Sequence, residues 1–285
     1  MAEKTVETNA KAKGGMDLIT VMGLVVAMGG ILGGLLLEGG KLKDVAQFTA
    51  GLIVLGGTAG AVLVSVPRKT LFGGLKRLRA VFFDPVSDNE HLIEEIIRLA
   101  TKARKNGLVS LELDATKIED PFLRKALNLA VDGTDLQEIR KMLELEIGLE
   151  EHQAEAEAKV FEYAGGFAPT VGIIGAVMGL IQVMKNLANI DEVGHGIAVS
   201  FVATVYGVGI ANLFFLPAAN KIKARAHVDA MRKEMIVEGI SGLVEGMNPK
   251  LIRMKLDSYL PGAAPKPEKN EKAPRAAESP VRAEA

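Results

Sequence analysis

The stretch MDLITVMGLVVAMGGILGGLLL, residues 16–37, decides the fold class. Its only charged residue is Asp17 at the very start. About 21 uncharged residues follow, and at ~1.5 Å per residue they cover the ~30 Å hydrocarbon core of a bilayer. The stretch therefore predicts a transmembrane helix. A secretory signal peptide has a shorter apolar core and a small-residue cleavage site, whereas this run ends in LLLEGG.

Three more uncharged runs follow along the chain. The second is residues 45–66, and the connector EGGKLKD before it is just long enough for a tight turn between antiparallel helices. The third and fourth are residues 163–184 and 196–219, joined by KNLANIDEVGH. The sequence predicts an all-α polytopic membrane protein with four transmembrane helices. They form two hairpins, residues 16–66 and 163–219, with a large cytoplasmic helical insert between helices 2 and 3.

The composition fits a membrane protein and excludes other classes. With 48% hydrophobic and 24% charged side chains in 285 residues, a disordered or collagen-like polymer is excluded. The 34 Lys and Arg balance 35 Asp and Glu, so the basic excess of a nucleic-acid-binding protein is missing. There is no Cys, which excludes disulfides, thiolate zinc sites and thiol catalysis. Many of the 31 Gly lie in the apolar runs, which is typical of helices that pack in lipid.

Basic residues near the span ends predict the orientation. They gather before the first span, after the second and after the fourth, at Lys4, Lys11, Lys13, Arg68, Lys69, Lys76, Arg77, Arg79, Lys221, Lys223 and Arg225. The two short connectors hold only Lys41, Lys43 and Lys185, against Glu38, Asp44, Asp191 and Glu192. Under the positive-inside rule, both termini and the insert are expected in the cytoplasm.

Four further regions are predicted outside the spans. Residues 1–15 are a cytoplasmic N-terminal extension, 67–162 a cytoplasmic helical domain, and 220–260 cytoplasmic C-terminal helices that pack on that domain. The tail, residues 261–285, is rich in Pro, Ala, Lys and Glu and cannot bury apolar surface. It is expected to be disordered.

The insert has the apolar period of α-helices. One stripe ends at Gly107 and consists of Leu92, Ile93, Ile96, Ile97 and Leu99. The last helix of the insert is expected to be capped by Thr134 or Asp135 and to continue into the third span. Such a rod would couple the cytoplasm to the membrane.

The predicted spans contain no Asp, Glu, Lys, Arg or His apart from Asp17 at an interface. An ion pathway through lipid normally needs such a group inside the bundle, so either the chain conducts nothing or another chain supplies the group. Glycine pairs at small-xxx-small spacing favour tight helix association, within the chain or between subunits. These pairs are Gly29 and Gly33, Gly30 and Gly34, Gly56 and Gly60, and Gly175 and Gly179.

Two prolines and a threonine mark the third and fourth spans. Pro169 and Pro217 lie near the cytoplasmic ends, at similar depth in an antiparallel hairpin. Each removes a backbone N–H and frees a carbonyl, so together they mark either a gate or kinks without function. Thr204 either bonds the carbonyl of Ser200 one turn earlier or lines a polar path.

Charged residues of the insert are open to two interpretations. Arg104 and Glu112 stand on either side of a glycine break. They are either solvated charges or a docking surface whose strength depends on salt, since exposed ion pairs are individually worth ~1 kcal/mol or less.

No signature of an enzyme is present. The sequence has no P-loop, dinucleotide fingerprint or HExxH motif. Its four histidines are scattered without the carboxylate or thiol spacing that a metal needs. We predict no enzymatic activity, no metal site and no cofactor.

Several segments together resemble the MotA and PomA family of flagellar motor stator subunits. They are FAPTVGIIGAVMGLIQVMKNL, the proline-ended span SFVATVYGVGIANLFFLPAANKIK, ARKNGLVSLE in the insert, and the late EGMNPKLIRMKL. The resemblance covers about residues 16–260, and the order, spacing and topology of the segments all agree. Only the N-terminal extension and the tail fall outside it.

The resemblance implies an assembly and a location. It implies a ring of five such chains around two copies of a MotB-like single-span partner in the bacterial inner membrane. The membrane helix of that partner would carry the aspartate that takes the ion. Proton or sodium flow through the complex would drive torque on the rotor protein FliG.

The resemblance also implies roles for individual residues. Pro169 and Pro217 match the two functional prolines of the family beside the ion path, and Thr204 matches its channel-facing threonine. Arg104 and Glu112 match the two cytoplasmic charges that engage FliG. Sodium-driven members resemble one another in a threonine seven residues after the first proline, where this chain has Ala176. That difference favours protons over sodium.

Two other interpretations remain at the level of sequence. One is an ExbB- or TolQ-like subunit that energises an outer-membrane process; those relatives have three spans and a different insert placement. The other is a membrane scaffold that conducts nothing. Ion flux with and without an aspartate-bearing partner separates them.

Overall fold

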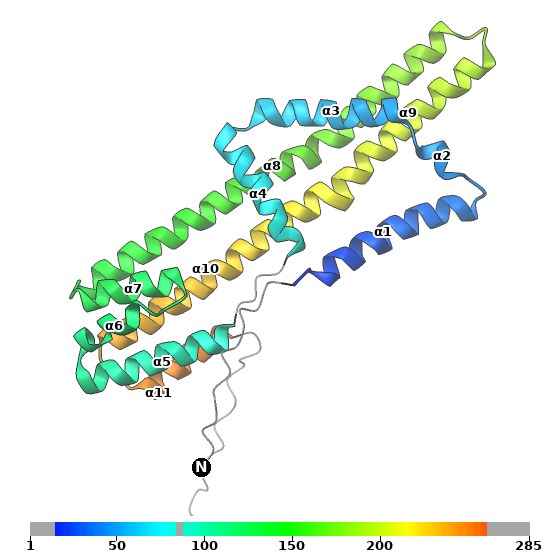
Figure 1. The fold of residues 1–285 in the computed structure, drawn as a ribbon. Helices are drawn as coiled ribbons and strands as arrows, with labels where there is room; N and C mark the ends of the chain where they lie inside the picture. Colours follow the sequence, from blue (N-terminus) through cyan, green and yellow to red (C-terminus); the bar gives the residue numbers. More distant parts are fainter. Residues whose placement is uncertain (1–14, 84–87, 261–285) are drawn as a thin grey trace, which may run out of the picture.

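The computed structural model describes residues 15–83 and 88–260. Its described part consists of helices joined by short connections, as predicted for an all-α protein. Two long antiparallel helical rods lie side by side along the whole molecule, and the other helices pack around them (Figure 1). Most of the predicted N-terminal extension and the predicted tail, residues 261–285, lie outside the described residues.

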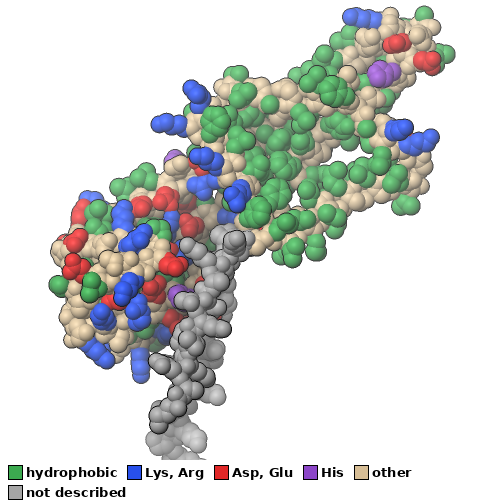
Figure 2. Space-filling model, in the orientation of Figure 1, with side chains coloured by type: hydrophobic (Ala, Val, Ile, Leu, Met, Phe, Trp, Pro, Cys, Tyr) green, Lys and Arg blue, Asp and Glu red, His purple; other side chains and the backbone are tan. Residues whose placement is uncertain are grey.

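Four helices in the described ranges are long and apolar enough to cross a membrane. They lie in Leu18–Leu37, Leu42–Ser65, Leu136–Lys185 and Ile190–Val244. The number of candidate spans agrees with the sequence prediction. Apolar side chains cover the part of the surface formed by these spans, whereas acidic and basic side chains gather at one end of the molecule (Figure 2).

The first rod is α8, Leu136–Lys185, a single helix of 50 residues and about 75 Å at 1.5 Å per residue. The Asp135 side chain caps it by accepting a hydrogen bond from the Gln137 N–H at 2.8 Å. The predicted continuous helix from insert to span is therefore present. The apolar run of residues 163–184 is its last part.

The second rod combines three helical segments without a break. These are α9 Ile190–Ile210, the π-helical turn η2 Ala211–Phe215 and α10 Leu216–Val244. The predicted fourth span, residues 196–219, thus continues into the C-terminal helix. Gly246, with φ of +69°, ends that helix in the left-handed region that glycine readily adopts, and α11, Pro249–Asp257, follows.

The first two spans are α1, Leu18–Leu37, and α3, Phe48–Ser65, separated by the single turn α2, Leu42–Val45. We predicted one helix over residues 45–66, but the backbone leaves helical geometry at Ala46 and Gln47. At 18 residues, α3 is still about 27 Å long, close to the thickness of the hydrocarbon core.

The cytoplasmic part predicted from the sequence forms one helical module. It contains α5 Asn89–Asn106, η1 Leu108–Leu111, α6 Glu112–Ala115 and α7 Pro121–Val131. One apolar core joins these helices to the first turns of α8, the end of α10 and α11. The C-terminal helices therefore pack on the insert, as expected. The amphipathic helix α4, Arg68–Phe82, links α3 to this module.

Candidate functional site

The helices α8 and α9 approach closely because small residues line their contact. Gly172, Gly175 and Gly179 of α8 are buried. A Cβ atom on Gly172 would lie 2.9 Å from the carbonyl oxygen of Ala203 on α9, and one on Gly175 would lie 2.8 Å from the Ala203 Cβ. Both positions require glycine, since larger side chains would force the helices apart.

Two hydroxyls lie at this contact. The Ser200 Oγ donates to the carbonyl oxygens of Ala176, on α8, at 2.8 Å and of Gly196 at 2.9 Å. The Thr204 Oγ1 donates to the Ser200 carbonyl at 3.2 Å. The helix bond predicted as one alternative for Thr204 is therefore present. Thr204 and Ala176 are both half-buried and lie near each other through Ser200.

The two prolines affect the helices differently. Pro169 lies inside α8, four residues after Gly165, so the Gly165 carbonyl has no helical N–H partner at that position. Pro217 stands two residues after the π-helical turn, in which the hydrogen-bond ladder shifts by one residue and accommodates the missing N–H. Both rods therefore continue through their prolines.

The prolines are not at the same depth. Leu216 of α10 packs on Gly165 of α8, where a Cβ would meet its Cδ2 at 2.6 Å. The backbone contacts set the register of the two rods, since a Cβ on Gly207 would meet the Ala168 carbonyl, so Pro169 is level with Gly207. Pro217 lies ten residues after Gly207, roughly 15 Å further along the second rod toward the helical module. Pro217 is exposed toward α1, where it lines a cavity of about 320 Å³ together with Thr20, Asn212 and Lys221.

An ion cluster at that cavity fixes the start of α1. The Asp17 carboxylate accepts hydrogen bonds from the Lys221 Nζ and, at 3.1 Å, from the Arg225 Nη2 of α10. The Asp17 N–H also donates to the Phe82 carbonyl at the end of α4, at 2.8 Å. Asp17 thus connects α1 to α10 through its carboxylate and to α4 through its backbone N–H. The sequence analysis missed this role.

Tyr206 of α9 forms hydrogen bonds with the backbone at the break between α2 and α3. Its hydroxyl donates to the Val45 carbonyl at 2.5 Å and accepts from the Gln47 N–H at 3.3 Å. Backbone groups freed by a helix break in a membrane must find such partners. The one signal for this residue in the sequence is a tyrosine within an otherwise apolar span.

The predicted glycine pairs fall into two groups. Gly175 and Gly179 pack against α9 within the chain. The six other glycines have no described heavy atom within 4 Å of where a Cβ would be, apart from their chain neighbours and the backbone of their own helix. These are Gly29, Gly30, Gly33, Gly34, Gly56 and Gly60. Of the four predicted pairs, Gly175 and Gly179 therefore serve helix packing within the described part of one subunit.

Arg104 and Glu112 lie at the tip of the helical module, away from the spans (Figure 1). Arg104 is in the last turn of α5 and Glu112 is the first residue of α6, with the turn at Gly107, φ of +82°, between them. Both side chains are exposed, and the described residues include no ion pair to either. The fold brings the two charges to one surface without pairing them.

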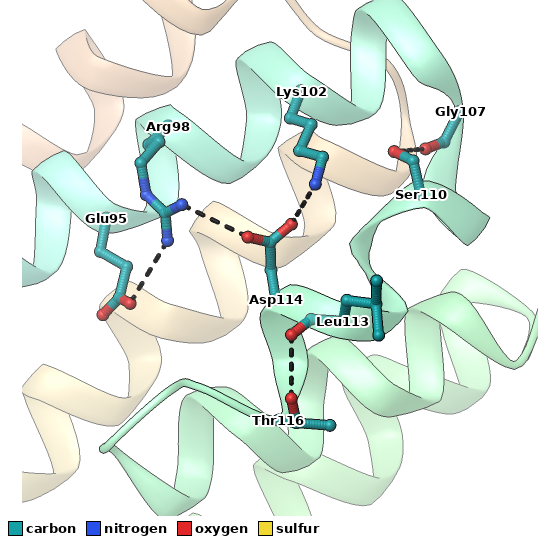
Figure 3. A network of polar contacts seen from close by, with 8 residues as sticks. All are labelled: Glu95, Arg98, Lys102, Gly107, Ser110, Leu113, Asp114 and Thr116. Atoms are coloured by element: carbon teal, nitrogen blue, oxygen red, sulfur yellow. Dashed lines mark hydrogen bonds and ion pairs between the residues drawn. The ribbon is translucent and has the colours of Figure 1, made fainter.

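Asp114 holds this tip together (Figure 3). Its carboxylate accepts from the Lys102 Nζ at 2.6 Å and from the Arg98 Nη1 at 3.4 Å, both on α5. The Lys102 hydrogen bond lowers the pKa of Asp114 below its ordinary value. Sequence analysis did not single out this residue, although it is two positions from Glu112.

Comparison with known proteins places these features in a family. Residues 114–235 match the MotA/TolQ/ExbB proton channel family, and residues 21–107 match the motility protein A N-terminal family. Motility protein A of Bacillus subtilis is 35% identical over 251 residues, 86% of this chain and 92% of the relative. Chemotaxis protein PomA of Vibrio alginolyticus is 31% identical over 245 residues, 86% of this chain and 96% of the relative.

Two solved structures of MotAB proteins also match this chain. The structure of MotAB from C. jejuni matches with a TM-score of 0.83 and 34% identity, covering 88% of this chain and 98% of that chain. The flagellar MotAB stator complex from Bacillus subtilis matches with a TM-score of 0.79 and 34% identity, over 86% of this chain and 96% of that chain.

Fold, span number and motif order define a class of membrane proteins, the ion-channel subunits with four spans and two long helical rods. This is not a known enzyme family. The chain belongs to the MotA and PomA family of flagellar motor stator subunits, within the MotA/TolQ/ExbB proton channel family.

Proposed function

We propose that this chain, together with a MotB-like single-span partner, forms an ion channel of the flagellar motor that converts ion flow into torque on the rotor protein FliG. Family membership supports the stator role. The observation that carries the channel proposal is that the four apolar runs, residues 16–37, 45–66, 163–184 and 196–219, contain no acidic side chain beyond Asp17. Asp17 itself is held at the start of α1 by Lys221 and Arg225. The ion-binding carboxylate must come from a partner.

The positive-inside rule sets the proposed orientation. Arg68, Lys69, Lys221 and Lys223 lie at the end of the spans that faces the helical module, whereas the opposite connectors carry Lys41, Lys43 and Lys185 beside acidic residues. The module, residues 67–162 with 220–260, is then cytoplasmic, as are the regions 1–15 and 261–285. The chain lies in the bacterial inner membrane.

The ion pathway runs along the rods at the position of the small-residue contact. Thr204, Ala176, Pro169 and Pro217 are the residues of this chain that we assign to it. Ser200 engages the backbone beside Ala176 and Thr204, so the α8–α9 contact is a rigid wall against which a partner helix moves. Pro217, near the module, marks the cytoplasmic end.

Five copies of the chain surround two copies of the partner in this proposal. Glycines whose open sides face no described residue, on α1 and α3, allow helices of neighbouring subunits to come close. Each ion neutralises a partner carboxylate and lets the ring step around the partner. An elementary charge moved through the membrane potential supplies ~2.3 kcal/mol per 100 mV, which is enough to bias a step.

The rods carry the step to the rotor. The helix α8 is continuous from span to module, so rotation of the spans moves the tip that bears Arg104 and Glu112. These charges then pass the charges of FliG. The match of residues 21–107 to the motility protein A N-terminal family favours this role over an ExbB- or TolQ-like one.

Reconstitution tests the proposal. The chain alone in liposomes should stay impermeable under an imposed ion gradient, whereas the chain with a co-purified single-span partner that carries a membrane aspartate should conduct. A matched sample with that aspartate changed to asparagine is the control. Robust gradient-driven current through the chain alone would overturn the scheme, and no current in any sample would favour a scaffold.

A further inference from the structure

We propose that Val109 and Leu113 form the apolar centre of the surface through which this chain contacts the rotor, with Arg104 and Glu112 at its edge. The inference rests on the proposed function and adds the contact chemistry. Val109 and Leu113 keep 71% and 75% of their surface exposed, the highest values among the large apolar side chains of the described helical module.

Three neighbouring side chains of this segment, Leu111, Asp114 and Ala115, are held by the module. The chain stays helical from Leu108 to Ala115, and Leu111 and Ala115 are buried in the module core. Asp114 turns toward α5 and its two cations (Figure 3). Because Val109 and Leu113 are four positions apart, they share the outward face.

The outward face also holds the predicted rotor charge of the segment. Glu112 is adjacent to Leu113, and Arg104 lies on the far side of the Gly107 turn, at the end of α5. Two exposed aliphatic side chains thus lie beside the acid, with the base across the Gly107 turn. Scattered exposed apolar residues are ordinary, but a pair on one face beside unpaired charges is typical of a docking surface.

The segment is rigid before any partner arrives. Lys102 and Arg98 hold Asp114, the Ser110 Oγ donates to the Gly107 carbonyl at 2.7 Å, and the Thr116 Oγ1 donates to the Leu113 carbonyl at 2.9 Å (Figure 3). A preorganised surface loses little conformational entropy on binding. It therefore suits a contact that forms and breaks at every step.

Charge alone gives such a contact little strength. Exposed ion pairs are weak and are screened beyond about 8 Å at physiological salt. An apolar pair supplies attraction that salt does not remove, while the charges set approach and register. The partner that fits is a protein surface with an apolar patch, a base opposite Glu112 and an acid opposite Arg104.

Binding of purified FliG from the same organism to the full chain, purified in detergent with its partner subunit, tests this. Val109→Ala with Leu113→Ala should weaken binding about tenfold, with the slope of log affinity against log salt unchanged. Arg104→Ala with Glu112→Ala should instead flatten that slope. Leu145→Ala with Leu149→Ala is the matched control, since these α8 leucines have the same spacing and are 63% and 61% exposed.

The outcomes separate the two proposals. Unchanged affinity of the Val109 and Leu113 variant, when the charge variant binds less, would overturn the apolar centre and leave the rotor contact standing. An equal loss in the α8 control would also overturn it. Absence of binding by the unaltered complex at every salt concentration would overturn the rotor assignment itself. Melting temperatures of all variants show whether the module stays folded.

Discussion

The hydroxyl of Ser200 on α9 donates to the backbone carbonyl of Ala176 on α8 at 2.8 Å, and this hydrogen bond joins the two rods within their apolar parts. It is a side-chain bond between helices in a region where packing is otherwise made by glycine and alanine. Interhelical hydrogen bonds of this kind contribute about 0.6 to 1.7 kcal/mol in membranes.

Ser200→Ala should therefore destabilise the purified complex by about 1 kcal/mol without altering its assembly, because alanine is smaller and creates no clash. The measurement is the thermal unfolding midpoint in detergent. Ser65→Ala is the control, since the Ser65 Oγ bonds the Ala61 carbonyl of its own helix at 2.7 Å. An equal loss in both variants would show that the bond between α9 and α8 has no special weight.

Glycine substitutions should separate packing within a subunit from packing between subunits. Gly172→Ala puts a Cβ at 2.9 Å from the Ala203 carbonyl, so it should lower folding stability by about 1 to 3 kcal/mol. The Cβ of Gly33→Ala meets no described atom within 4 Å apart from its chain neighbours and the backbone of its own helix. It should leave the subunit folded and weaken the oligomer.

Size-exclusion chromatography and thermal unfolding of the two variants check this. Gly33→Ala should shift the protein toward smaller assemblies at unchanged secondary structure. If Gly172→Ala were as stable as the unaltered chain, the close contact of α8 and α9 would not be rigid. If Gly33→Ala had no effect on assembly, its open side would face lipid.

The two cytoplasmic charges allow a direct test of torque. Arg104→Glu with Glu112→Lys reverses both exposed charges and touches no ion pair of the described module. At normal expression, swimming speed and tethered-cell torque should fall strongly. Lys105→Glu, at the exposed neighbour of Arg104, is the control for a general change of charge at the tip. Unchanged torque in the double variant would refute the rotor assignment.

Asp114 gives the module a predictable dependence on pH. The Lys102 hydrogen bond lowers the pKa of Asp114, so the carboxylate stabilises the folded state above its unfolded pKa of about 3.9. That stability is lost as the pH falls through the lowered folded value. Asp114→Asn should cost about 1 to 2 kcal/mol at pH 7 and nothing at the acid end.

Unfolding midpoints of the unaltered chain and of the Asp114→Asn variant, measured between pH 7 and pH 3, check this prediction. The curves should run parallel at neutral pH and converge below about pH 4. Glu112→Gln serves as the control, because that side chain is exposed and should change stability little at any pH. A difference between the two proteins that persists undiminished at pH 3 would show that Asp114 acts by something other than its charge.

The sequence was sufficient for the spans and the long rod because both rest on local properties. Uncharged length predicts a span, and Asp135 is a cap that can be read from its position before a helical pattern. The break at Ala46 and Gln47 could not be predicted, because what stabilises it is the hydroxyl of Tyr206, about 160 positions away. Apolar composition alone favours one continuous helix.

In the candidate site, too, local features could be predicted from the sequence and contacts between distant residues could not. The positions of Pro169 and Pro217 were chosen from the pattern of the motif, but their depth depends on the π-helical turn before Pro217, which no periodicity indicates. Asp17 was treated as a residue at an interface. Its partners Lys221 and Arg225 lie more than 200 residues further along the chain, so only the fold connects them.

Ala176 leads to a prediction about the coupling ion. Sodium needs several oxygen ligands. This position offers a methyl group, whereas the family resemblance implies a threonine hydroxyl here in sodium-driven members. The carbonyl of Ala176 is already engaged by Ser200, which removes one more oxygen from the path. Swimming speed should therefore stay constant when potassium replaces sodium at fixed ionic strength, and it should vanish with a protonophore. Flux in liposomes driven by a sodium gradient alone, with the partner subunit present, should be undetectable; a sodium current of the size of the proton current would contradict the prediction.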